Sequence, residues 1–180
     1  MSARQPFNWV LPQYRGRLLI VLSVLVLAST TWLVWFGQVL HTEAAPNGIV
    51  SFELAGTAES AGEILQSWSP RARAVALLIQ GFDSLYLVLY PAWYALAMVL
   101  LATRLGGRWA RAGLLLSWLV LLAAPLDAVE NYALNQQLLY GADDGYAALS
   151  LWCALPKFGL VIAGSVYLLL GLVALALRRQ

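Results

Sequence analysis

Residues 74–102 read AVALLIQGFDSLYLVLYPAWYALAMVLLA, and this stretch decides the fold class. A helix needs about 20 predominantly apolar residues to cross a hydrocarbon core of about 30 Å, so the run is long enough to span a membrane. Three further apolar stretches, 18–40, 112–132 and 147–177, meet the same requirement. The sequence therefore predicts an all-α polytopic membrane protein: residues 1–180 form one domain, a bundle of four transmembrane helices.

The composition of the whole chain indicates the same class. Of its 180 residues, 61% are hydrophobic and 11% are charged, whereas soluble domains carry about 25% charged residues. The mean hydropathy is +0.72. A net charge of +2 is too small to indicate binding to nucleic acid. The single cysteine, Cys153, excludes an internal disulfide, and the single histidine, His41, excludes a bis-His haem.

The basic residues predict the orientation, because Lys and Arg near the ends of spans are retained in the cytoplasm. Eight of them fall on one side of the four spans: Arg4, Arg15, Arg17, Arg104, Arg108, Arg111, Arg178 and Arg179. We expect both termini to be cytoplasmic, in a bacterial inner membrane. The first apolar run is longer than the core of a cleaved signal, so we expect it to remain as a span.

The connection between the first two spans is long, and residues 45–70 carry their own helix signals. Thr57 is a suitable N-cap for a short helix, and Pro70 separates that helix from the next span. We expect this segment to lie in the outer interface as a lid. The connection 103–111, by contrast, is short enough to predict an antiparallel hairpin.

Four ionisable residues lie inside the predicted spans, where a charge costs about 2.5 to 3.5 kcal/mol at the helix centre. They are Asp83, Asp127, Glu130 and Lys157. Asp127, Glu130 and Asn131 follow the spacing i, i+3, i+4, which places them on one helix face. We expect one buried cluster in which Lys157 pairs with a carboxylate, and excess negative charge is removed by a proton, a cation, or Arg71 or Arg73.

Two interpretations of this cluster remain open. In the first, it fixes only the packing of the helices. In the second, it is a ligand site, since Pro91, Pro125 and Pro156 lie close by and kinks there could open a cavity.

The second span also carries an aromatic stripe at three- and four-residue spacing, which can serve either packing or a ligand. Its members are Phe82, Tyr86, Tyr90, Trp93 and Tyr94. Small residues of the fourth span, among them Gly159, Gly164 and Gly171, predict close helix contacts within the bundle or between chains.

Two short stretches carry a family resemblance: FELAGT at 52–57 and DAVEN at 127–131. In these the chain resembles a family of bacterial four-span membrane proteins without an assigned activity. The resemblance implies the four-span fold and carries no site residues across.

Two function hypotheses follow. In the first, a polar site in the outer half of the bundle binds a lipid-like or cationic ligand, with acid/base chemistry or bound Mg²⁺ or Ca²⁺ as options. Its candidate residues are Asp83, Asp127, Glu130, Asn131, Lys157, Glu53, Tyr86 and Tyr90. In the second, the chain is an accessory or assembly subunit of a larger membrane complex, or a homo-oligomer, and the cluster is structural. Neither hypothesis requires catalysis, so the sequence leaves open whether the chain is an enzyme.

Overall fold

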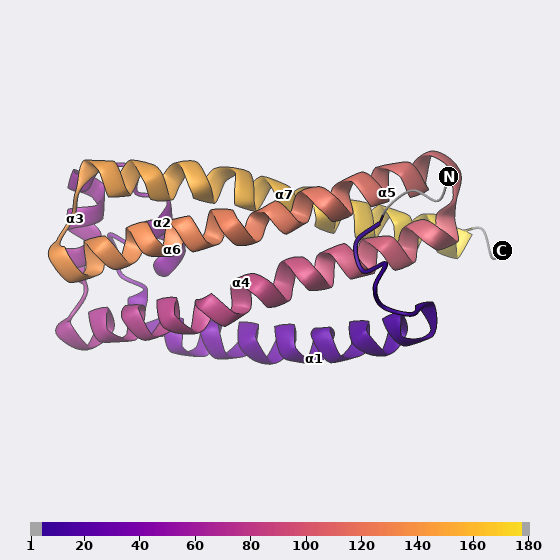
Figure 1. The fold of residues 1–180 in the computed structure, drawn as a ribbon. Coiled ribbons are helices and arrows are strands. Elements are labelled where there is room, and N and C mark those ends of the chain that lie inside the picture. The colour runs from indigo at the N-terminus through magenta and orange to yellow at the C-terminus, as the bar shows by residue number, and fades with distance from the viewer. Residues whose placement is uncertain (1–4, 178–180) are drawn as a thin grey trace. The chain divides into compact units, whose positions relative to one another are not determined.

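The computed structural model describes residues 5–177, and every regular element in that range is helical (Figure 1). The predicted all-α class is therefore confirmed. In chain order the elements are α1 (Pro12–Gly37), the 3₁₀ helix η1 (Gln38–Leu40), α2 (Ile49–Glu53), α3 (Ala58–Ser67), α4 (Pro70–Leu105), α5 (Gly107–Leu119), the 3₁₀ helix η2 (Val120–Leu122), α6 (Ala123–Tyr140) and α7 (Asp144–Leu177).

Four helical segments are long and apolar enough to cross a membrane, as predicted. They are Pro12–Leu40, Pro70–Leu105, Gly107–Tyr140 and Asp144–Leu177. The third is longer than expected, because α6 continues past residue 132 to Tyr140 before the turn into α7. The added residues include Gln137, which is buried, so this extension contributes to the interior of the bundle.

The three prolines affect their helices in different ways. Pro91 lies inside α4 and Pro156 inside α7, and both helices continue through them. Pro125 is the third residue of α6 and lies three residues after the end of η2, a 3₁₀ turn that interrupts the third span. A proline removes one backbone donor and crowds the preceding turn, which accounts for the irregular geometry at this point.

The chain divides into two compact units. One comprises residues 1–26, 88–124 and 157–180, and the other residues 27–87 and 125–156. All nine acidic residues of the sequence belong to the second unit, and nine of the eleven Lys and Arg residues belong to the first. We therefore call them the basic unit and the acidic unit.

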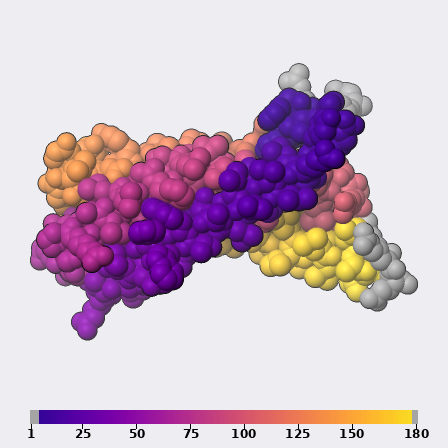
Figure 2. Space-filling view, turned by 90° about the horizontal axis from the view of Figure 1, so that it is seen from below, coloured from indigo at the N-terminus to yellow at the C-terminus, as the bar shows by residue number. Residues whose placement is uncertain are grey.

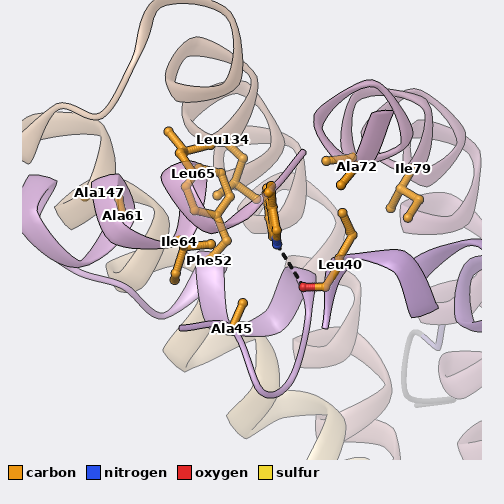
Figure 3. Packing of buried hydrophobic residues seen from close by; sticks show 12 residues of the cluster. Leu40, Ala45, Phe52, Ala61, Ile64, Leu65, Ala72, Ile79, Leu134 and Ala147 are labelled. Carbon is orange, nitrogen blue, oxygen red and sulfur yellow. Dashed lines mark hydrogen bonds between the residues drawn. The ribbon is translucent and has the colours of Figure 1, made fainter. Parts of the chain in front are cut away.

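The core of the acidic unit joins α2 and α3 to the long helices (Figure 3). Phe52 of α2 is fully buried and meets Trp68 edge to face, with ring centroids 5.3 Å apart. Trp68 donates its indole N–H to the carbonyl of Leu40 at 2.8 Å, the dashed line in Figure 3. Leu134 of α6 and Ala147 of α7 complete this cluster, so segments far apart in sequence share one apolar core.

The predicted lid segment is docked by hydrogen bonds as well as by its apolar side chains. Thr57 caps α3 by accepting from the N–H of Ser60 at 3.3 Å, which confirms the predicted N-cap. The carboxylate of Asp144 accepts from the N–H of Ala58 at 2.7 Å. Ser150 of α7 donates to the carbonyl of Glu53 at 2.9 Å. The segment is therefore fastened to the first two turns of α7.

The stretch 52–57 has a structural role at each of several positions. Gly56 adopts φ +73°, a conformation that side chains disfavour, and an added Cβ there would lie 2.9 Å from Leu151 Cδ2. Together with the buried Phe52 and the capping Thr57, this glycine sets the turn that joins α2 to α3. The stretch is accounted for by the docking of the lid onto α7.

The core of the basic unit is apolar and tightly packed. Its buried cluster contains Ala95, Met98, Leu101, Leu105, Val120 and Tyr167. A Cβ at Gly164 would lie 2.5 Å from Met98 Cε, and one at Gly171 would lie 2.6 Å from Leu101 Cδ2. Gly159 has open space instead. Two of the predicted small residues thus allow α7 to approach α4 within the bundle.

The outer surface of α1 is apolar and open, and Figure 2 shows this helix in indigo to purple across the viewed face. Only 11% of the most apolar window of this span is buried, against 44% in the span formed by α4. Exposed side chains such as Val24, Leu27 and Trp35 form that surface. An apolar exterior of this kind is what a hydrocarbon environment requires.

Candidate functional site

Helix α6 directs its polar residues inward and its apolar residues outward. Asp127, Glu130, Asn131 and Gln137 are buried on one face, and Glu130 and Gln137 have no exposed surface. On the opposite face Val129, Tyr132 and Leu139 are about half exposed. This is the reverse of a soluble amphipathic helix and agrees with the predicted inward-facing carboxylates. We call the four buried residues the α6 polar face.

Helix α4 contributes two polar side chains to the same unit. The amide Nδ2 of Asn131 donates to Oδ2 of Asp83 at 2.6 Å, which ties α6 to α4. Gln80 lies one turn before Asp83 and is 2% exposed. The structure thus brings two of the predicted residues, Asp83 and Asn131, into direct contact inside the acidic unit.

Two glutamine side chains in this unit have buried amide atoms without a hydrogen-bond partner among residues 5–177. Neither Oε1 nor Nε2 of Gln137 has one, and the same holds for Oε1 of Gln80. An unsatisfied buried polar group costs about 1 to 3 kcal/mol. These atoms therefore offer hydrogen-bonding capacity inside an apolar bundle.

Sequence reasoning missed Gln80 and Gln137. Both carry a signal in their spacing: Gln137 lies seven residues after Glu130, two helical turns along the same face, and Gln80 lies three before Asp83. The sequence predicts that the third span ends near residue 132, so Gln137 falls outside the predicted spans. Glutamine is uncharged, so its presence in a span is a weaker signal than that of the four ionisable residues.

Glu53 is placed near α7 by the lid. It is half buried at the end of α2, and its backbone carbonyl accepts the hydrogen bond from Ser150. Ser150 and Ala154 are small, fully buried residues of α7 in the same unit. The predicted fifth member of the site therefore belongs to the acidic unit with the other carboxylates.

Lys157 belongs to the basic unit, where it is 6% exposed and lies with its Nζ 4.8 Å from the ring centroid of Phe158. Its pairing with a carboxylate stays a prediction. Of the other cations considered, Arg73 donates from both Nε and Nη2 to the backbone carbonyl of Leu65, and Arg71 is exposed. Arg73 thus fastens the end of α3.

The aromatic stripe of α4 is engaged in contacts with α1. In the acidic unit Phe82 stacks on Trp32 at 4.2 Å between centroids, and the hydroxyl of Tyr86 lies 3.0 Å from Thr30 Oγ1. In the basic unit Trp93 donates to Ser23 Oγ at 2.8 Å, and Tyr90 is buried. These contacts favour the packing interpretation of the stripe.

Within residues 5–177 no three His, Cys, Asp or Glu side chains come together as a metal site. Bound Mg²⁺ or Ca²⁺ stays a prediction. The cavity described below lies in the basic unit, so the predicted opening beside Pro91, Pro125 and Pro156 stays a prediction.

Comparison with known proteins gives no match: no family model, no curated protein and no solved structure is similar to this chain. The geometry of the α6 polar face is accordingly the basis for a function.

Proposed function

We propose that the acidic unit binds the polar head of an amphipathic molecule, one that carries a cationic or hydroxyl-bearing group. The observation that supports this most is Gln137, whose two amide atoms are fully buried beside a carboxylate-bearing face and have no partner among the described residues. A hydroxyl or ammonium group brought to that face would satisfy the amide oxygen and interact with carboxylate oxygens.

The free-energy cost of burying polar groups without partners supports a binding role. Helix packing alone is achieved with apolar side chains, and a buried polar group that lacks a partner lowers stability. A ligand that supplies the missing hydrogen bonds recovers that free energy on binding. The free energy recovered on binding then contributes to the affinity for the polar head, whereas the free protein lacks this stabilisation.

The same residues set the chemistry available to the bound molecule. Asp83 already accepts a hydrogen bond from Asn131, so its position is fixed. Asp127 and Glu130 lie on the α6 polar face, with 4% and 0% of their surface exposed. Should the molecule react, these carboxylates are the groups able to accept or donate a proton.

The proposed setting is a bacterial inner membrane with both termini in the cytoplasm. Arg15, Arg17 and the cluster at 104–111 support this orientation; Arg4, Arg178 and Arg179 add to it in sequence but lie outside the described residues. The lid segment and the turn 141–145 then face outward. A ligand of the acidic unit would enter from that side or from the outer leaflet.

Native mass spectrometry of the purified protein tests the proposal. We expect a small molecule to co-purify with the wild-type chain and to be lost from Glu130→Gln and Gln137→Leu. The matched control is Glu43→Gln, which removes the same charge from an exposed position of the same unit and should retain the molecule. Retention of the adduct by both site variants would overturn the proposal.

One observation favours the alternative, an accessory or assembly subunit. The hydrogen bond between Asn131 and Asp83 joins two helices directly, as a structural staple does. In that case the wild-type protein carries no small ligand, and a protein partner or a second copy co-purifies with it instead. The same mass spectra therefore distinguish the two functions.

A further inference from the structure

The basic unit contains an elongated cavity that is separate from the α6 polar face. Its volume is about 580 Å³. It is lined by α1 through Gly16 and Leu19, by α4 from Trp93 to Arg104, and by α7 from Ser165 to Leu175. The lining residues of α7 include Leu169 and Leu172, which are more than half exposed. The cavity is thus a groove that opens on the outer surface of the helices.

The length of the groove matches one leaflet of a bilayer. From Trp93 to Arg104 the α4 wall advances eleven residues, about 16 Å at the helical rise of about 1.5 Å per residue. The α7 wall advances ten residues from Ser165 to Leu175, about 15 Å. Half of a hydrocarbon core of about 30 Å is of the same length, so an extended acyl chain fits along the walls.

The two ends of the groove differ in polarity. At one end the polar groups are already engaged with one another: the Tyr94 hydroxyl lies 2.7 Å from Ser165 Oγ, and Trp93 Nε1 donates to Ser23 Oγ. At the other end lies Arg104, an exposed guanidinium in the last turn of α4. The groove is therefore apolar along its length, with hydrogen-bonded polar groups at one end and a guanidinium group at the other.

The described part of the basic unit carries no negative side chain. It holds six Lys and Arg residues and no Asp or Glu, which disfavours a cationic head group by repulsion. Among the neighbouring arginines, Arg15 donates to the carbonyl of Val10 and is buried, whereas Arg17 is exposed one residue from Gly16. Arg104 lines the groove, and Arg17 adjoins the lining residue Gly16; both guanidinium groups are exposed.

We propose that this groove binds an anionic phospholipid. One acyl chain lies along the walls formed by Leu19, Leu101 and Leu168, and the phosphate accepts hydrogen bonds from Arg104. Basic pockets between transmembrane helices bind the heads of anionic lipids in this way. The site differs from that of the proposed function in unit, in polarity and in the charge of its ligand, so neither depends on the other.

Two variants probe the groove without disturbing the packed core. Gly16→Leu places a side chain at the groove wall, where a Cβ meets nothing within 4 Å, so the helix can accept it. Its control is Gly159→Leu, at another glycine of the basic unit with open space that does not line the groove. Arg104→Gln removes the cation, and Arg108→Gln removes an exposed cation outside the groove.

The experiment titrates the delipidated protein with phosphatidylglycerol or phosphatidylcholine and counts bound lipids by native mass spectrometry. We expect wild type and both controls to retain one phosphatidylglycerol in preference to phosphatidylcholine. Gly16→Leu should lose most of this adduct, and Arg104→Gln should reduce the preference about fivefold. Glu130→Gln should bind the lipid as wild type does.

Several outcomes would overturn the proposal. Equal binding of the two lipids shows that the groove does not select an anionic head. An unchanged adduct in both Gly16→Leu and Arg104→Gln places the lipid elsewhere on the protein. A dimer that forms in place of the lipid complex and dissociates in Gly16→Leu assigns the groove to a second copy of the chain. Should Gly16→Leu fail to fold, the Arg104 pair of variants decides alone.

Discussion

The two units of this chain differ in the polar side chains that they bury. The acidic unit buries Gln80, Asp127, Glu130, Asn131, Gln137 and Ser150 beside its apolar cluster. The basic unit buries Arg15, Ser117 and Lys157, and Tyr167 joins alanine, leucine, methionine and valine in its core cluster, where α7 comes close to α4 at Gly164 and Gly171. The basic unit contains no Asp or Glu, so its core shows that helices of this chain can pack without buried carboxylates.

The formal charges of the units make the same contrast. The basic unit carries +9 and the acidic unit −7, although the whole chain carries only +2. A near-neutral composition thus conceals a strong separation of charge. The two proposed ligands follow from it, because an anionic lipid head is attracted to the first unit and a cationic head to the second.

The largest effect is expected from removal of the aromatic anchor of the acidic unit. Phe52→Ala should lower the free energy of unfolding by about 3 to 5 kcal/mol, because the ring is fully buried against Trp68. Chemical unfolding in detergent micelles measures the change. Leu54→Ala, at a side chain that is 38% exposed, serves as the control and should cost far less. Equal losses would show that the polar face, and not this cluster, holds the unit together.

Lys157 is the buried lysine of the basic unit, and its replacement tests how that unit accommodates a buried charge. Lys157→Met should lower the free energy of unfolding by about 3 kcal/mol, since groups that compensate a buried ammonium are left uncompensated. Arg108→Met, at an exposed position, should change it by less than about 0.5 kcal/mol. Equal melting temperatures of the two variants would show that the contacts of the buried ammonium add no more to stability than those of an exposed cation.

The close helix contact of the basic unit is probed by a matched pair of glycines in α7. Gly164→Ala should lower the free energy of unfolding by about 1 kcal/mol, because the end of the Met98 side chain and the Tyr94 ring must shift to admit the new methyl group. Gly159→Ala should cause no loss, since a Cβ there has open space. Thermal unfolding of both variants gives the comparison, and a stable Gly164→Ala would mean that the Met98 side chain moves aside freely.

The polar face of the acidic unit should behave in the opposite way. Gln137→Leu is expected to raise the free energy of unfolding by about 1 kcal/mol, because it removes a buried amide whose atoms lack partners. Gln136→Leu, at the adjacent half-buried position, is the control and should have little effect. A substantial loss of stability in Gln137→Leu would identify the amide as part of the packing.

The smallest effect on stability accompanies the test of orientation. In a Cys153→Ala background, Glu59→Cys and Arg108→Cys place single thiols at exposed positions of the acidic and basic units. We expect an impermeant maleimide added outside the cell to label residue 59 and not residue 108. The reverse pattern would invert the proposed topology and with it the side from which each ligand arrives.

Much of the fold was predictable because membrane spans are encoded by local composition. Long apolar runs located all four helices, the i, i+3, i+4 spacing placed Asp127, Glu130 and Asn131 on one face, and Thr57 marked the start of α3. These signals need only neighbouring residues. The helix ends were less certain, and α6 extends through Gln136 and Gln137, polar residues whose burial no hydropathy average anticipates.

What could not be predicted depends on contacts between distant segments. The stacking of Phe82 on Trp32 and the bond between Tyr86 and Thr30 require the rotation of α1 about its axis, which a uniformly apolar helix does not reveal. The groove beside Arg104 likewise arises where three helices meet. Periodicity tells which residues share a face, but not which face of another helix they meet.

The docking of the lid onto α7 also sets an order of events during synthesis. The hydrogen bond from Ala58 to Asp144 joins residues 86 positions apart, and that from Ser150 to Glu53 joins residues 97 apart. Neither can form until the last helix has left the ribosome. Until then the cluster around Phe52, Ile64 and Trp68 lacks Ala147, and α2 and α3 lack both hydrogen bonds that hold them to α7. The first connection of the nascent chain is therefore completed only when the last helix is present.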